Sequence, residues 1–153
     1  MSFDPNKLQS EYQRNGAVLL KNVLDKSMLE ELARGVDRNR AHPTSRQIDY
    51  VKDEQSGEHF FHDAMLIDEN PHYRKTVFDS SLADRVAAMM QTQRVIVSNV
   101  TVFLRSAGTS RRTRWHRDQP YWPVSGRQCC STWIPLDSVS RETALEFVAA
   151  QLS

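Results

Sequence analysis

The side chains best suited to metal chemistry in this sequence of 153 residues are His116 and Asp118, which are separated by one arginine. In an extended segment alternate side chains project to the same face, so this imidazole and this carboxylate can point at one spot. Oxygen-activating enzymes hold Fe(II) with two histidines and one carboxylate on one face of the ion. The pair supplies two of these three ligands, although an isolated His-x-Asp pattern is more often a hydrogen-bonded surface pair.

The residues around the pair extend the pattern along the chain. The motif Trp115-His-Arg-Asp-Gln-Pro-Tyr-Trp-Pro123 is followed by Cys130-Ser-Thr-Trp-Ile-Pro-Leu-Asp137 and by Glu142-Thr-Ala-Leu-Glu-Phe-Val148. Far upstream lies Tyr12-Gln-Arg-Asn-Gly-Ala-Val-Leu-Leu-Lys-Asn-Val-Leu24. This ordered set resembles the phytanoyl-CoA dioxygenase family. The likeness rests on the Trp-His-x-Asp motif, on a later strand with a Trp and a Leu-Asp turn, and on a Gly-Ala-Leu-x-Phe-Val-like strand.

The resemblance implies an oxygenase that depends on Fe(II) and 2-oxoglutarate and hydroxylates a small molecule. His116 and Asp118 would bind Fe(II), and Thr113, Arg105 and Trp133 would contact 2-oxoglutarate. A core position for the Trp133 indole is an equal alternative to stacking on the oxo-acid. The implied fold is α+β, with N-terminal helices packed on a double-stranded β-helix of the jelly-roll or cupin-like type.

Family members continue beyond the last of these motifs with strands that carry a distal histidine and a basic partner for 2-oxoglutarate. No histidine follows His116 in this sequence. We therefore expect a C-terminally truncated member with an incomplete β-helix and impaired turnover. Unpaired strand edges favour self-association. A non-catalytic remnant or interaction module that retains the scaffold is the alternative to an active enzyme.

Composition predicts one domain over residues 1–153, because 39% hydrophobic and 25% charged residues are ordinary for a globular protein. A net charge of +1 gives no field that would recruit nucleic acid or acidic membranes. No apolar run suits a membrane span, and the N-terminus lacks a signal pattern. The adjacent Cys129 and Cys130 predict free thiols in a reducing cytoplasm.

Helical periodicity and capping residues predict four helices. They cover residues 6–15, a segment that begins at Ser27 with Glu30 completing a capping box, a short helix from Asn70-Pro71, and residues 81–91. The stripe on the second helix is predicted to pack in the core, and it consists of Met28, Leu29, Leu32, Ala33 and Val36.

Runs rich in β-branched and aromatic residues predict strands over 17–23, 95–104, 128–135 and 145–149, with a turn over 140–144. The polar stretch 38–58 is predicted to be irregular. Directly after it lie His59 and His62, where a third metal ligand could be sought. Packing or contact with substrate is favoured over metal binding for these two histidines.

A basic loop over residues 105–114 precedes the His116 motif. A solvated loop is favoured over a phosphate or nucleic-acid site, because no aromatic platform is interleaved with the arginines. A narrower possibility is that the loop attracts an acidic cosubstrate or a CoA-type phosphate. The arginines concerned are Arg105, Arg111, Arg112 and Arg114.

Overall fold

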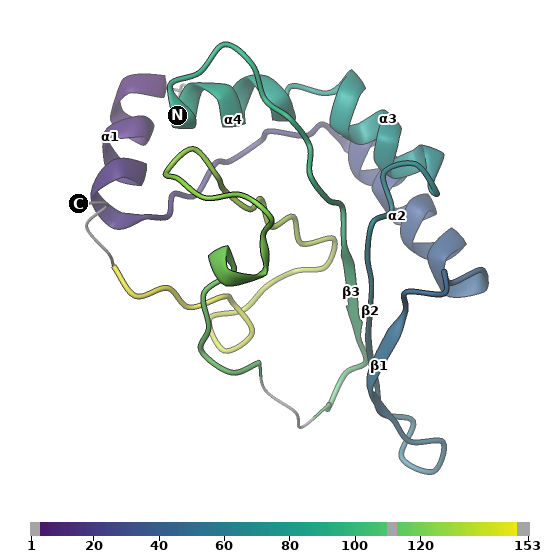
Figure 1. The fold of residues 1–153 in the computed structure, drawn as a ribbon. Coiled ribbons are helices and arrows are strands. Elements are labelled where there is room, and N and C mark those ends of the chain that lie inside the picture. Colours follow the sequence, from purple (N-terminus) through teal and green to yellow (C-terminus); the bar gives the residue numbers. More distant parts are fainter. Residues whose placement is uncertain (1–3, 110–112, 150–153) are drawn as a thin grey trace.

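The computed structural model describes residues 4–109 and 113–149, so Arg111 and Arg112 lie outside the described residues. The architecture is α+β, as the sequence predicts, with helices beside a small antiparallel sheet of order β1-β2-β3 (Figure 1). In chain order the elements are α1 (Pro5–Asn15), α2 (Lys26–Ala41), β1 (Ile48–Lys52), β2 (His59–Asp63), α3 (Pro71–Asp79), α4 (Leu82–Met90), β3 (Val102–Arg105) and the short 3-10 helix η1 (Gln119–Tyr121).

Helix α1 has the local signals that the sequence predicts. The Asp4 carboxylate accepts hydrogen bonds from the backbone N–H groups of Asn6 and Lys7, at 3.1 and 3.2 Å. Gly16 ends the helix in the left-handed conformation, with φ of 73°. A residue without a Cβ adopts this conformation without steric penalty, which is why the helix stops there.

The start of α2 corrects one prediction. Asp25, two residues before the predicted start, caps the helix by accepting a hydrogen bond of 2.9 Å from the Met28 backbone N–H. Ser27 lies inside the first turn and donates from its hydroxyl to the Asp25 carboxylate at 2.7 Å. The predicted capping box of Ser27 and Glu30 is therefore wrong, because a carboxylate nearer the start already accepts the free N–H.

The core lies between α2, α3 and one face of the sheet. Phe61, Leu66, Tyr73 and Val102 form its buried cluster. Leu32 and Val36 of α2 pack against the cluster, as the predicted stripe requires, whereas Leu29 is 38% exposed. Burial of these apolar side chains is the main driving force that holds α2 and α3 on the sheet.

A buried polar network joins α2, β2 and α3 beneath this core. Asp63 is completely buried, and its carboxylate accepts from the Asn39 side chain at 2.7 Å. It also accepts from the backbone N–H and the hydroxyl of Thr44, at 2.8 and 2.6 Å. The Asn70 side chain donates to the Gly35 carbonyl at 2.9 Å and to Asn39 at 3.1 Å. The network satisfies groups whose burial would otherwise be costly.

The strand predictions are largely wrong. Residues 17–23, 128–135 and 145–149 do not form strands, and only Val102–Arg105 of the predicted strand 95–104 joins the sheet. The predicted irregular stretch 38–58 instead contains the end of α2 and the whole of β1. A strand exists only where a second strand pairs with it, and a single segment's composition does not reveal its partner. The predicted turn is correct, because Thr143 N–H bonds to the Ser140 carbonyl at 3.2 Å.

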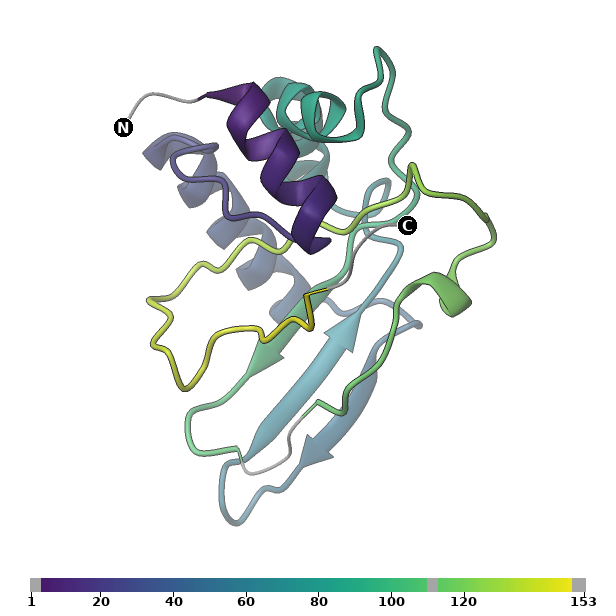
Figure 2. The same cartoon turned by 90° about the vertical axis from the view of Figure 1, so that its left-hand side faces the viewer.

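The sheet has different neighbours on its two faces. Helix α2 covers one face through the core. Residues 113–149 cross the molecule on the opposite side of the sheet, as the two views of the ribbon agree (Figures 1 and 2). The segment that carries the His-x-Asp motif is thus separated from the core by the sheet.

Candidate metal centre

His116 and Asp118 lie on an extended stretch that ends in a tight turn. The backbone from residue 113 to residue 117 has no regular secondary structure. The short helix η1 starts directly after Asp118, where the Tyr121 N–H bonds to the Asp118 carbonyl at 2.9 Å. The two side chains are about half exposed, at 47% and 48%, so the site is open to solvent.

The two side chains converge, as their alternate spacing predicts. The Nε2 atom of His116 lies 3.2 Å from Oδ1 of Asp118. The Nδ1 atom of His116 lies 2.7 Å from the Arg114 carbonyl oxygen. A carbonyl only accepts hydrogen bonds, so Nδ1 carries the hydrogen and donates it. In the neutral imidazole, Nε2 then presents its lone pair toward the carboxylate.

Asp118 has a further partner that the sequence did not single out. The Ser131 hydroxyl donates to Oδ2 of Asp118 at 3.0 Å, across thirteen residues of chain. This bond leaves Oδ1 directed at the imidazole. The sequence contains one indication of this contact. Ser131 lies two residues before Trp133, so both share one face of the predicted strand, and the family resemblance places Trp133 at the site.

The donor set fits a divalent metal of borderline character. Two neighbouring ligands about 2.1 Å from an octahedral ion lie about 3.0 Å apart, close to the observed Nε2–Oδ1 distance. Histidines that bind metals nearly always donate their other ring N–H to a carbonyl or carboxylate, as His116 does. A hydrogen bond between an imidazolium and a carboxylate has a similar length, so the surface-pair alternative fits the same distance.

The residues predicted to contact 2-oxoglutarate lie on the segment of this pair and at the end of β3. The side chains of His116 and Asp118 themselves form hydrogen bonds or an ion pair with each other, with the Arg114 carbonyl and with Ser131. Thr113 and Trp133 are exposed on the same segment. Arg105 lies at the end of β3 and donates to the Thr109 carbonyl at 3.0 Å.

Three of the four other histidines have other neighbours. His59 pairs with Asp49 at 2.9 Å, and His72 pairs with Glu31 at 2.7 Å. His62 packs against aromatic rings in the sheet. Within the described ranges, 4–109 and 113–149, no group of three or more His, Cys, Asp or Glu side chains is placed to hold a metal ion.

Comparison with protein families identifies the class of the chain. The model of the phytanoyl-CoA dioxygenase (PhyH) family matches residues 12–149, and the chain therefore belongs to this family. Neither the comparison with curated proteins nor the comparison with solved structures gave a match. In the part of the chain that the structure describes, no helix is both long and apolar enough to cross a membrane.

Proposed function

We propose that this protein acts as an Fe(II)- and 2-oxoglutarate-dependent oxygenase that hydroxylates a small molecule. The observation that carries the proposal is the hydrogen bond from His116 Nδ1 to the Arg114 carbonyl. It directs Nε2 to a point 3.2 Å from Oδ1 of Asp118. Family membership over residues 12–149 supports the same chemistry. Bound together, Fe(II) and 2-oxoglutarate would supply the activation of O₂ that C–H hydroxylation requires.

Each residue of the pair has a defined task in this proposal. His116 and Asp118 hold the metal through Nε2 and Oδ1. The Arg114 carbonyl fixes the orientation of the imidazole, and the Ser131 hydroxyl fixes that of the carboxylate. Such supporting hydrogen bonds typically change metal affinity by about 10- to 100-fold.

The cosubstrate site forms the less defined part of the proposal. Thr113 and Trp133 share the segment of the metal pair, and the indole offers a flat surface for the oxo-acid. Arg105 supplies positive charge at the end of β3, where it would attract a carboxylate of 2-oxoglutarate.

Two protein ligands hold a divalent ion less firmly than three, so we propose a weak metal site with impaired turnover. Completion of the site and of a double-stranded β-helix would require residues beyond those described. The apolar side chains of Trp133, Phe147 and Val148 are at least half exposed, which favours self-association through this segment. The same exposure supports the second candidate function, an interaction module without turnover. Both cysteines are free thiols, which suits a reducing cytoplasm.

An anaerobic absorption measurement tests the proposal. Chelation of Fe(II) by 2-oxoglutarate in such a site produces a visible charge-transfer band. The wild-type chain should develop this band at high Fe(II) concentration, and Asp118→Ala should not. Asp49→Ala is the matched control, because it removes the carboxylate of the other exposed His–Asp pair. A band of equal strength in Asp118→Ala would contradict the proposed site.

A further inference from the structure

A polar cavity of about 290 Å³ opens between the end of α2 and the start of α3. Its walls include Arg38 and His42 at the end of α2, Arg46 from the loop that leads to β1, and Glu69 just before α3. The cavity lies beside α2, on the side of the sheet away from residues 113–149 (Figures 1 and 2). It is therefore separate from the candidate metal centre.

The floor of the cavity is held by the buried polar network. Asn39 and Asn70 line it and are 3% and 2% exposed. The Asn70 side chain donates to Asn39 at 3.1 Å, and the Asn39 side chain donates to the Asp63 carboxylate at 2.7 Å. Asp63 is completely buried below this floor, and its oxygens also accept from both donors of Thr44 and from the Ala64 N–H. Because these hydrogen bonds disperse its charge, Asp63 does not oppose an anion in the cavity as an unpaired carboxylate would.

Arg46 is fixed at one wall of the cavity. Its Nε donates to the Ala64 carbonyl at 3.1 Å, and its guanidinium lies 3.1 Å from the Glu69 carboxylate. Glu69 is the one acidic side chain among the lining residues, and Arg46 offsets its charge. The charge of Arg38 therefore has no acidic counterpart on the walls.

The other wall groups offer hydrogen-bond donors that the described part of the chain does not use. The His42 backbone N–H bonds to the Arg38 carbonyl at 2.9 Å, so these two exposed residues lie one helical turn apart. Among residues 4–109 and 113–149, no hydrogen bond or ion pair engages the side chains of Arg38, His42 or Ser45. The carboxyl end of α2 and the amino end of α3 both meet the cavity, and their opposite partial charges offset each other. The side chains therefore decide which charge the cavity prefers.

From this lining we infer that the cavity binds a small tetrahedral oxyanion, either inorganic phosphate or a phosphomonoester. The ligand is distinct from the substrate and the cosubstrate of the proposed oxygenase, and the inference does not depend on that function. A phosphoryl group offers three strongly accepting oxygens, which suits three donor side chains better than the two oxygens of a carboxylate. Arg38 supplies the planar guanidinium that pairs with two of these oxygens.

Isothermal titration calorimetry with inorganic phosphate, at an ionic strength held constant with sodium chloride, tests the site. The wild-type chain should bind one phosphate, and Arg38→Ala should weaken the affinity at least about fivefold. Arg40→Ala is the matched control, because Arg40 is also in the last turn of α2 and exposed but does not line the cavity. Both variants lose the same charge, so equal weakening would show a general attraction to the end of α2 and would overturn the inference. Absence of saturable binding by the wild-type chain would overturn it as well.

Two further titrations define the ligand. Tighter binding of glycerol phosphate than of inorganic phosphate would identify a phosphomonoester as the ligand, and the reverse order would identify the free ion. Acetate should bind more weakly than either, because it has two oxygens and one charge. Acetate binding as tight as that of phosphate would contradict the preference for a tetrahedral oxyanion and overturn the inference.

Discussion

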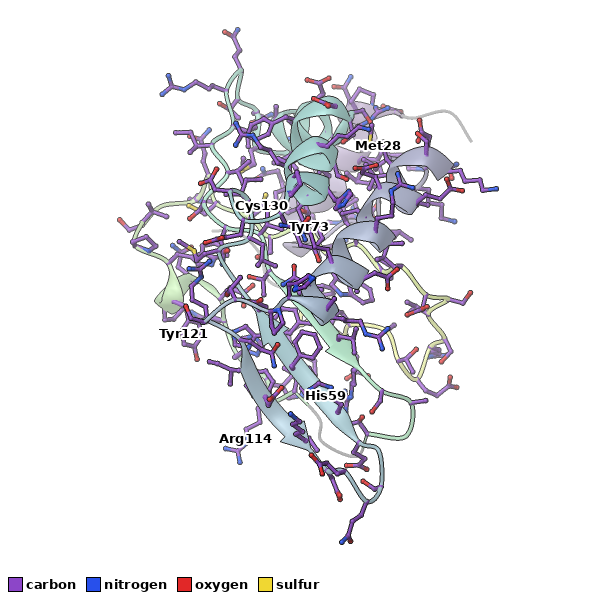
Figure 3. All side chains as sticks on the ribbon, turned by 90° about the vertical axis from the view of Figure 1, so that its right-hand side faces the viewer. Met28, His59, Tyr73, Arg114, Tyr121 and Cys130 are labelled. Atoms are coloured by element: carbon purple, nitrogen blue, oxygen red, sulfur yellow. The ribbon has the colours of Figure 1, made fainter. Side chains whose placement is uncertain are left out.

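The two ends of the described chain differ in how they are held. Among the residues that the structure describes, every buried one lies from Glu31 to Val102. Between residues 113 and 149, no described residue is fully buried, and the half-buried ones are Trp122, Cys129, Cys130 and Ile134. Figure 3 shows the contrast, since Tyr73 lies enclosed near the helices while Arg114 and Tyr121 lie at the periphery. Tyr73 is 3% exposed and Tyr121 is 78% exposed.

Stability and the proposed chemistry are therefore located in separate parts of this molecule. The region of α2, α3 and the sheet supplies the apolar core and the buried polar network. The segment 113–149 carries His116 and Asp118, the proposed metal ligands. One of its contacts with the rest of the chain is the hydrogen bond of 3.3 Å from the Gln128 side chain to the Met90 carbonyl at the end of α4. Burial next to α1 raises the pKa of the Cys130 thiol, and burial likewise raises that of Tyr12 on this helix.

The largest expected effect comes from the buried network of the first region. Asp63→Ala leaves Asn39 and Thr44 with buried donors and no acceptor, so it should lower the free energy of unfolding by about 3 kcal/mol or more. Urea denaturation followed by circular dichroism measures this loss. Asp68→Ala is the control, because Asp68 is exposed and forms a surface ion pair with Arg74, so the change should stay within about 0.5 kcal/mol. Similar losses in both variants would contradict the network's role.

A second test concerns acid stability of the contact between α2 and α3. Hydrogen bonds from Arg34 and His72 hold the pKa of Glu31 at about 2, well below its ordinary value of 4.5. Because the folded state lowers this pKa, its stabilising contribution is complete above about pH 4.5 and disappears as the pH falls toward 2.

Unfolding free energies measured between pH 6 and pH 2.5 check this expectation. The wild-type chain should lose stability over the lower part of that range, and Glu31→Gln should lose less because its side chain does not titrate. Glu30→Gln should follow the wild type, since Glu30 is exposed and its ion pair with Lys26 spans 3.8 Å. An identical pH profile in Glu31→Gln would show that this carboxylate does not contribute.

The smallest expected effect on stability comes from the second region. Trp133 is half exposed and has no place in the core, so Trp133→Ala should change the free energy of unfolding by less than about 0.5 kcal/mol. The same variant should reduce self-association, measured as the concentration dependence of the sedimentation coefficient. A loss of stability comparable to that of Asp63→Ala would erase the distinction between the two regions.

The sequence predicts the helices well because their signals are local. Asn15-Gly16 marks the end of one helix, and Asn70-Pro71 marks the start of another. Each signal consists of adjacent residues, and the structure confirms both. Asp25 competed with Ser27 for the same capping role and was overlooked. Strands depend on partners that are distant in sequence. The stretch Ile48–Lys52 became a strand because β2 pairs with it, whereas the apolar run 17–23 found no such partner.

At the candidate site, too, the sequence predicts the local features and not the long-range ones. The alternation of His116 and Asp118 predicts that their side chains converge, and they do, at 3.2 Å. The hydrogen bond from Ser131 joins segments thirteen residues apart, so spacing alone does not reveal it. The sheet depends on the pairing of three strands, and one of these strands lies in a stretch expected to be irregular.

Anaerobic Co(II) titration of three proteins shows whether His116 and Asp118 bind a metal ion. His116→Ala removes the proposed ligand, and His59→Ala removes the imidazole of the other exposed His–Asp pair, whose atoms lie 2.9 Å apart. We predict that the wild-type chain and His59→Ala bind Co(II) with similar affinity, and that His116→Ala binds it at least about tenfold more weakly. Equal affinity in the wild type and His116→Ala would show that His116 and Asp118 are a surface hydrogen-bonded pair and not a metal site.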